Sequence, residues 1–379
     1  MTNIVKSKSL EEKTFDECIN GKYNDDLKIP LILFSPEVKN EKDLNKYLKM
    51  YDKIVSGINY IGKDNLGKAK FIFDSLNDSK LNRYQFESVP FTQVITNQLS
   101  GLATDSIGDC RSLTYLMSTV SQNKGVKNLK ILKQKNHLGN ILKNKQDLIE
   151  IDNTISNGFG VKTKDFYRIE ELSFVVPSFL NFLGENNRNI SEAIQYYTKA
   201  ILLQNEYPEA YINRSIARMK TEKFSNTLLA KGDLNTALKQ GFLEPELYYY
   251  LGKVENNLGN FSSGIVNLDK AIECDPNERG VHLERGRAFY QIGKFDYALR
   301  DFEIELSKGL GNHKIYHYLA LANFKLGNKK EAKENFKIYK EFEDFLKNSK
   351  ENSVLEQDKK FNNSFELNVE NGEEFCLYG

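Results

Sequence analysis

The spacing of apolar residues near the N-terminus predicts a helical region that begins after a polar extension. Residues 1–41 are polar and irregular in pattern, apart from one short apolar run. Over residues 42–60 and again over residues 65–77, apolar side chains return every three or four positions, as on the buried face of a helix. The stretch from there to Asp109 contains Pro90 and a turn-rich end, so we expect a loop.

The pattern after residue 109 predicts a buried helix followed by a small sheet. Four apolar residues share one helical face between Cys110 and Gly125, where we expect this helix to begin and end. Three short apolar runs follow at residues 129–132, 138–142 and 148–151, separated by Lys, Asn and Gln. Runs of this length between polar turns predict short strands.

The second half of the chain repeats itself with a period of about 34 residues, a length typical of helical repeat arrays. Gly252 and Gly286 are one period apart, and so are Gly259, Gly293 and Gly327 in turn. A small residue at the first two positions would let two helices touch, and a glycine after a helix can take the left-handed conformation that ends it. This period indicates paired antiparallel helices that stack into a solenoid.

The repeat resembles the tetratricopeptide repeat family. The matching residues recur in phase; they are Gly252, Gly259, Phe261, Ala271, Pro276, Gly286, Gly293, Phe295 and Ala298. Three good units and a leading half-unit fit residues 190–345, with Pro208 and Pro245 between units, where proline starts a helix well. The resemblance implies a groove lined by the first helix of each pair.

Register places aromatic, amide and basic side chains in this groove. They are Tyr249, Lys253, Asn256, Asn257, Arg287, Tyr290, Gln291, His317, Phe324 and Lys325. Such groups suit an extended peptide with carboxylate or amide groups, and packing on the N-terminal domain or another subunit is an equal alternative. His313 and His317 stand one helical turn apart, a spacing that can hold a metal, but no third ligand is near, so we expect no metal site.

Composition narrows the range of partners. The chain has 379 residues, enough for two domains, and a formal net charge of +1, which gives no general attraction to nucleic acid. No apolar run approaches the roughly 20 residues that cross a bilayer, and the first residues lack the apolar core of a signal peptide, so we expect a cytoplasmic protein. The four cysteines are far apart, which predicts free thiols.

Three residues of the first half stand in the order that a thiol nucleophile requires. Cys110 is expected in the first turn of its helix, where unpaired N–H groups and the helix dipole stabilise a thiolate. His137 follows at the start of the second predicted strand, and Asp152 comes directly after the third. Singly, such residues are usually a buried small side chain, a structural imidazole and a turn residue. Their joint order and placement favour a site.

This arrangement resembles the transglutaminase-like superfamily, a branch of the papain-like thiol fold, over about residues 65–155. The resemblance implies that Cys110 is the nucleophile, that His137 is its general base and later acid, and that Asp152 orients the imidazole. It also implies that the backbone N–H of Cys110 helps to hold a developing oxyanion.

Two further positions bear on the resemblance. Gln98 or Gln93 is the candidate for a second, side-chain donor to the oxyanion. The alternative is that either amide simply lies in solvent. Family members often carry an aromatic residue two positions after the histidine, where this chain has Gly139. This departure changes the expected shape of the acyl pocket but leaves the three reactive residue types in place.

Together the patterns predict an α+β papain/transglutaminase-like domain followed by an all-α tetratricopeptide-repeat solenoid. The expected boundaries are 1–41 for the extension, 42–170 for the thiol domain, 171–346 for the repeats and 347–379 for a polar, disordered tail. The expected function is a thiol hydrolase, protease- or amidase-like, that acts without a cofactor on a protein or peptide amide held by the repeats. A crosslinking transamidase, a non-catalytic interaction scaffold, and a thiol site covered by the repeats are the alternatives. Neither nucleic acid nor a membrane is an expected partner.

Overall fold

The computed structural model describes most of the chain. The described residues are 9–60, 64–77, 91–100, 109–133, 137–154, 158–161, 168–309 and 314–348. The chain forms two compact units, residues 1–240 and 241–379. This division falls between two helical hairpins, so the first unit contains the α+β part together with the first helices of the repeat array.

The first unit begins with five helices. They are α1 (Leu10–Ile19), α2 (Lys28–Leu33), α3 (Glu41–Gly57), α4 (Asn65–Leu76) and α5 (Phe91–Ser100). Helices α3 and α4 confirm the two helices that apolar spacing predicted. The first two helices lie in the segment expected to be an extension, and α2 buries Leu31 and Ile32 completely in the main core. The loop predicted up to residue 109 is wrong over α5, because Phe91, Val94 and Ile95 form a fully buried helical face.

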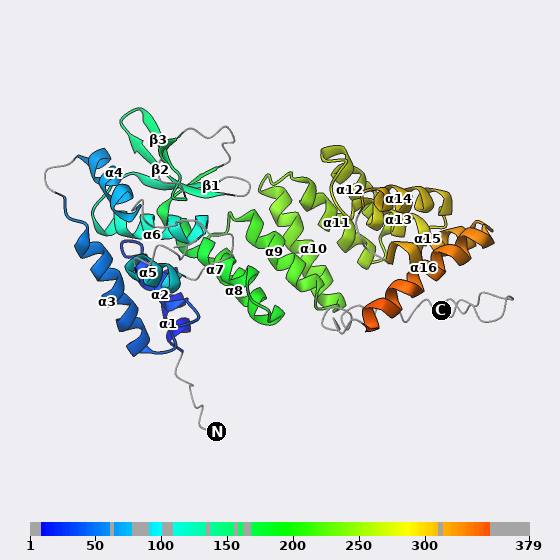
Figure 1. Ribbon diagram of the computed structural model, residues 1–379, viewed down its shortest axis with the longest axis horizontal. Coiled ribbons are helices and arrows are strands. Elements are labelled where there is room, and N and C mark those ends of the chain that lie inside the picture. The colour runs from blue at the N-terminus through cyan, green and yellow to red at the C-terminus, as the bar shows by residue number, and fades with distance from the viewer. Residues whose placement is uncertain are drawn as a thin grey trace, which may run out of the picture. The chain divides into compact units, whose positions relative to one another are not determined.

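Helix α6 (Cys110–Asn123) lies at the centre of this unit, between the sheet on one side and α5 on the other, and it also contacts α4, which lies beside the sheet (Figure 1). Because both sides are covered, all residues from Ser112 to Ser121 are buried. Asp109 caps its N-terminus by accepting a hydrogen bond from the Ser112 N–H at 2.8 Å. The predicted helix therefore begins at Cys110, as expected.

The sheet has five antiparallel strands in the order β4-β3-β2-β1-β5. The strands are β1 (Leu129–Lys133), β2 (Leu138–Asn144), β3 (Asp147–Ile151), β4 (Phe159–Val161) and β5 (Arg168–Glu170). The first three confirm the predicted strands, and the last two were not predicted. A short helix η1 (Leu172–Phe174) leads into α7 (Val175–Glu185), whose residues are almost all buried.

Helical hairpins form the rest of the chain. The first unit contributes α8 (Ile190–Leu203), α9 (Pro208–Met219) and α10 (Phe224–Lys239). The second contains α11 (Pro245–Asn257), α12 (Phe261–Cys274), α13 (Val281–Gln291), α14 (Phe295–Ser307), α15 (Lys314–Lys325) and α16 (Lys329–Asn348). Pro208 and Pro245 begin helices, as predicted. Gly259, Gly293 and Gly327 have φ of +80°, +76° and +84°, the left-handed conformation expected between the helices of a pair.

The repeat period reappears as a repeated contact. A Cβ atom on Gly252 would lie 2.4 Å from Cγ of Leu268, and one on Gly286 would lie 2.6 Å from Cε1 of Phe302. Leu268 and Phe302 are themselves one period apart, like the two glycines that they face. Only a residue without a side chain permits these hairpins to close, which explains why glycine recurs at this position.

A second repeated contact is an arginine that joins three helices. In the first unit, Arg214 of α9 donates to Asp233 of α10 at 2.7 Å and to Thr198 of α8 at 3.1 Å. In the second unit, Arg285 of α13 pairs with Asp301 of α14 and Asp269 of α12, each at 2.7 Å. Each arginine therefore ties its own hairpin together and also holds the preceding helix.

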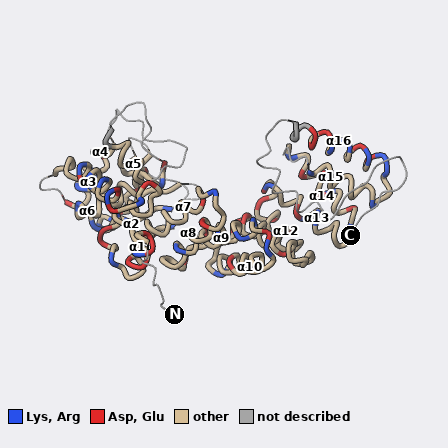
Figure 2. The backbone as a smooth tube through the Cα atoms, turned by 90° about the horizontal axis from the view of Figure 1, so that it is seen from below, with Lys and Arg blue, Asp and Glu red and all other residues tan. Residues whose placement is uncertain are grey.

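Charges are mixed along the molecule. Lys and Arg alternate with Asp and Glu along the helices of each unit (Figure 2), in keeping with the net charge of +1. Within the part of the chain that the structure describes, no helix combines the length and the apolar character needed to cross a membrane.

Candidate functional site

Cys110 occupies the first position of α6 and carries a free, half-buried thiol. Its neighbour Asp109 closes a capping box with Ser112, which fixes the first turn of the helix. The next residue, Arg111, pairs with Glu185 of α7 and so holds the start of α6 from a second direction. The thiol therefore stands at a helix N-terminus that is held from two directions.

His137 and Asp152 lie at neighbouring strand ends. His137 directly precedes β2 and Asp152 directly follows β3, and these strands pair antiparallel with Asn140 opposite Ile151. This register brings Nε2 of His137 to 3.3 Å from Oδ1 of Asp152. The contact is within ion-pair range, although the ring nitrogen does not meet the geometry of a hydrogen bond. Thr154 holds the same carboxylate oxygen through its backbone N–H at 2.9 Å.

The electrostatics link all three residues. Interaction with the Asp152 carboxylate, and then with the Cys110 sulfur, raises the pKa of His137 to about 10. Burial by itself raises the pKa of Asp152, but interactions with His137 and Thr154 outweigh it and lower that pKa to about 2. At neutral pH the arrangement favours an imidazolium between a carboxylate and the sulfur. The structure thus brings together the three residues that the sequence singled out.

The two glutamines named as oxyanion donors have other partners. Gln98 donates to the Leu76 carbonyl at 3.3 Å, and Gln93 donates to the side chain of Asn97 at 2.7 Å on the exposed face of α5. The structure gives neither amide a contact with the thiol.

The close approach of two strands explains why residue 139 is a glycine. A Cβ atom at this position would lie 2.8 Å from the carbonyl oxygen of Ile151, because β2 and β3 approach closely beside His137 and Asp152. An aromatic side chain at residue 139 is therefore incompatible with this sheet. Glycine at this position therefore follows from the close packing of the two strands whose ends hold His137 and Asp152.

Sequence reasoning missed a group of buried polar residues next to the site. They are Thr114, Ser118, Asn140 and Asn153, none of them more than 1% exposed. One signal was present, since Asn140 interrupts an apolar strand and Asn153 directly follows Asp152. A buried polar side chain inside an apolar run is a reason to look for a partner.

The predicted groove lies on helices that pack side by side, α11 against α13 and α13 against α15. Two of its basic residues, Arg287 and Lys253, already have an internal partner. Glu284 is 4% exposed and lies 3.0 Å from Arg287 and 3.9 Å from Lys253. The Glu284 carbonyl also accepts a hydrogen bond from Asn256 at 2.9 Å. These cations are therefore neutralised within the chain.

The remaining groove residues differ in exposure. Asn257, Gln291 and Lys325 are exposed, and the others are half-buried: Tyr249, Tyr290, His317 and Phe324. The His317 ring packs against Tyr339 of α16 with ring centres 5.0 Å apart, and burial lowers its pKa to about 4. This ring fills space between α15 and α16 and offers little surface to a peptide. His313 lies outside the described residues, among which no group of three His, Cys, Asp or Glu side chains could hold a metal.

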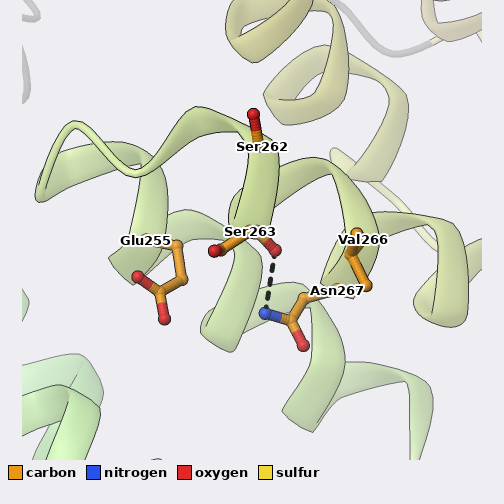
Figure 3. A pocket seen from close by; sticks show the side chains of 5 residues that line it. All are labelled: Glu255, Ser262, Ser263, Val266 and Asn267. Carbon is orange, nitrogen blue, oxygen red and sulfur yellow. Dashed lines mark hydrogen bonds between the residues drawn. The ribbon is translucent and has the colours of Figure 1, made fainter.

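The second unit also carries a hollow on α11 and α12, lined by Glu255, Ser262, Ser263, Val266 and Asn267 (Figure 3). Its polar groups pair locally, since Asn267 donates to the Ser263 carbonyl at 3.0 Å and Glu255 accepts from Asn260 at 2.8 Å. No histidine lines this hollow to activate either serine. It offers no arrangement for nucleophilic chemistry.

Comparisons with known proteins concern the repeat array. No protein-family model matches the chain. A stretch of 79 residues is 37% identical to a BBSome complex member BBS4 homolog of Drosophila melanogaster. This stretch makes up 20% of this chain and 16% of that protein. The chain thus spans less than a fifth of the length of that relative.

Solved structures with similarity include two repeat proteins. MamA of Desulfovibrio magneticus RS-1 is 15% identical, with 46% of this chain and 97% of that chain covered and a TM-score of 0.40. YrrB, described as a TPR protein with an unusual peptide-binding site, is 21% identical, with 50% and 91% covered and a TM-score of 0.38. By its own repeat period and repeated glycine contacts, the helical array over about half of this chain is of the tetratricopeptide type. The papain-like fold of the first unit stays a prediction.

Proposed function

We propose that the chain binds a protein or peptide partner through its tetratricopeptide-type array. The supporting observation is that the first helices α11 and α13 pack together and expose Asn257 and Gln291 at equivalent positions of successive repeats. Repeated positions of this kind suit an extended chain that is contacted once per repeat. The BBS4 homolog that matches 20% of this chain is by its name a member of a complex.

The chemistry of this surface suits peptide amides better than a free carboxylate. Glu284 already pairs with Arg287 and lies near Lys253, so neither cation is free to bind an anion without breaking an internal interaction. The exposed amides of Asn257 and Gln291 can each donate to and accept from a peptide backbone.

The test compares two double variants of the full chain that add the same charge. Asn257→Arg with Gln291→Arg changes the first helices, whereas Ser262→Arg with Ser307→Arg changes exposed positions on the second helices. A partner captured by wild-type protein and identified by mass spectrometry should bind the second variant and not the first. Equal binding to both variants would remove this surface from consideration.

A second function is favoured by the thiol site. We propose that Cys110 attacks an amide carbonyl of a bound protein, so that an S–C bond forms and His137 gives a proton to the leaving amine as the C–N bond breaks. Water then attacks the thioester while His137 accepts its proton, which releases the acid and restores the thiol. Asp152 holds the imidazole throughout. The proposal is supported by the 3.3 Å contact of His137 with Asp152 and by the interaction of His137 with Cys110.

The rate of iodoacetamide labelling against pH tests this second function without a substrate. On the intact native protein, Cys110 should react faster near neutral pH than Cys18, Cys274 and Cys376, because the positively charged His137 imidazole next to its sulfur favours attack by that sulfur. His137→Ala should abolish this advantage. A Cys110 that reacts no faster than the other thiols would leave the interaction function alone standing.

A further inference from the structure

Four polar side chains are enclosed between α6 and the sheet. Thr114, Ser118 and Asn140 are 0% exposed and Asn153 is 1% exposed. Each such group costs about 1–3 kcal/mol when it is buried without a partner, so their contacts decide whether this layer is tolerated.

A continuous set of hydrogen bonds joins the four side chains. The Asn153 amide donates to Oδ1 of Asn140 at 2.9 Å and to Oγ1 of Thr114 at 3.2 Å. The Asn140 amide donates to Oγ of Ser118 at 2.8 Å. The Thr114 hydroxyl donates to the Leu138 carbonyl at 2.9 Å.

The points where this network meets the backbone are adjacent to the thiol site. Asn153 directly follows Asp152, Leu138 directly follows His137, and Thr114 lies one helical turn after Cys110. The three segments come from α6, from the start of β2 and from the turn after β3. The network therefore ties the segment that carries each reactive residue to the other two.

We propose that Thr114 and Asn153 are positioning residues that hold Cys110, His137 and Asp152 in register. The inference rests on the proposed thiol function. The Thr114 hydroxyl is the central link, since it accepts from the segment that carries Asp152 and donates to the segment that carries His137. Without it, this network links β2 and the turn after β3 to the helix that carries Cys110 only through the Asn140–Ser118 hydrogen bond.

A purely structural role makes a different prediction, and isosteric variants separate the two. Thr114→Val keeps the shape and removes the hydroxyl, whereas Thr114→Ser keeps the hydroxyl. Thr119→Val is the matched control, because Thr119 is also buried in α6 but donates within its helix, to the Leu116 carbonyl at 3.1 Å. A structural role predicts similar effects for the two valine variants.

The readouts are the titration of the His137 imidazole by NMR and the pH dependence of Cys110 labelling, both on the full chain. The chain has four histidines, which keeps the imidazole spectrum simple. Thr114→Val should lower the pKa of His137 by about one unit or more and slow Cys110 labelling near neutral pH about tenfold. Thr114→Ser and Thr119→Val should both stay close to wild type.

The outcomes are distinguishable. A folded Thr114→Val protein with wild-type titration and labelling would overturn the positioning role, and so would an equal loss in Thr119→Val. If His137→Ala leaves the labelling of Cys110 unchanged, the thiol function itself fails. This comparison is made first, before any variant of the network is measured. If Thr114→Val does not fold, the milder Ser118→Ala removes one acceptor of Asn140 and should shift both readouts in the same direction.

Discussion

Replacing Gly286 with alanine gives a direct test of the repeated helix contact. The added Cβ would lie 2.6 Å from Cε1, 2.8 Å from Cδ1 and 3.1 Å from Cζ of Phe302, a ring that is fully buried. Real Cβ atoms do not approach carbon this closely, so the ring or the helix must move. The substitution therefore inserts a methyl group into a contact that has no room for it.

The magnitude follows from two opposing effects. Glycine to alanine inside a helix normally stabilises the fold by about 1 kcal/mol. Overpacking a core contact costs about 1–3 kcal/mol. The net expectation at Gly286 is a destabilisation of about 1 kcal/mol. Gly232, exposed within α10 with no atom within 4 Å of its Cβ position, shows the helix effect alone, so alanine there should stabilise by about 1 kcal/mol.

Urea unfolding followed by circular dichroism measures both variants on the full chain. Hydrogen exchange with mass spectrometry then shows whether the loss in Gly286→Ala is centred on α13 and α14. The two variants should change stability in opposite directions. The packing argument would be refuted if Gly286→Ala were as stable as Gly232→Ala, since the same substitution would then have the same effect with and without a facing ring.

Three further predictions concern single residues. Burial lowers the pKa of His317 to about 4 from its ordinary 6.5, helped by Lys340 and opposed by Glu343, so its neutral form is favoured in the fold. Above the unfolded pKa of about 6.5 both the folded and the unfolded chain hold the neutral ring, so the free energy of unfolding is at its full value. As pH falls from there towards 4, the unfolded chain takes up the proton and the free energy of unfolding decreases by about 1.4 kcal/mol per pH unit. In His317→Phe the urea midpoint should therefore change less over this pH range. Gly139→Ala should lower the melting temperature through its clash with the Ile151 carbonyl, a cost of about 1–3 kcal/mol, and an unchanged melting curve would contradict the close strand approach. Asp301→Ala should cost about 3 kcal/mol in urea unfolding, because it removes the two hydrogen bonds that Asp301 accepts from the mostly buried Arg285 and leaves that guanidinium only Asp269, and a loss below about 1 kcal/mol would show that this pair contributes little.

Apolar periodicity identified the elements that have one buried face. Helices α3 and α4 each bury one face, so their spacing was visible in the sequence. Strand β2 is buried over its first five residues, and it was visible as a short apolar run between polar turns. Helix α7 is buried on nearly all sides and shows no such contrast. Helix α5 follows Pro90 and carries several threonine and asparagine residues, which obscured its short buried face.

The candidate site was partly predictable for a related reason. Antiparallel neighbours must place His137 and Asp152 close together if the strands are correct, so chain order alone was informative. The buried amide network was not predictable, because it depends on which side chains of α6 face the sheet. Glu284 and Arg287 are i, i+3 neighbours on α13, a spacing that the sequence shows, but the approach of Lys253 from α11 appears only when the hairpins are stacked.

The arginines that join three helices have a consequence for how the array unfolds. The stability of a repeat array is approximately the sum of the folding free energy of each repeat and the interface free energy between neighbouring repeats. Unfolding is more cooperative when the interface free energy is large compared with the free energy of the single repeat. Arg285 contributes to both, because one guanidinium binds Asp301 in its own hairpin and Asp269 in the preceding one. Opening α13 therefore weakens its neighbour at the same moment. Adjacent hairpins linked in this way should melt as a block, and a partner bound across them would be released by one cooperative event instead of by gradual fraying.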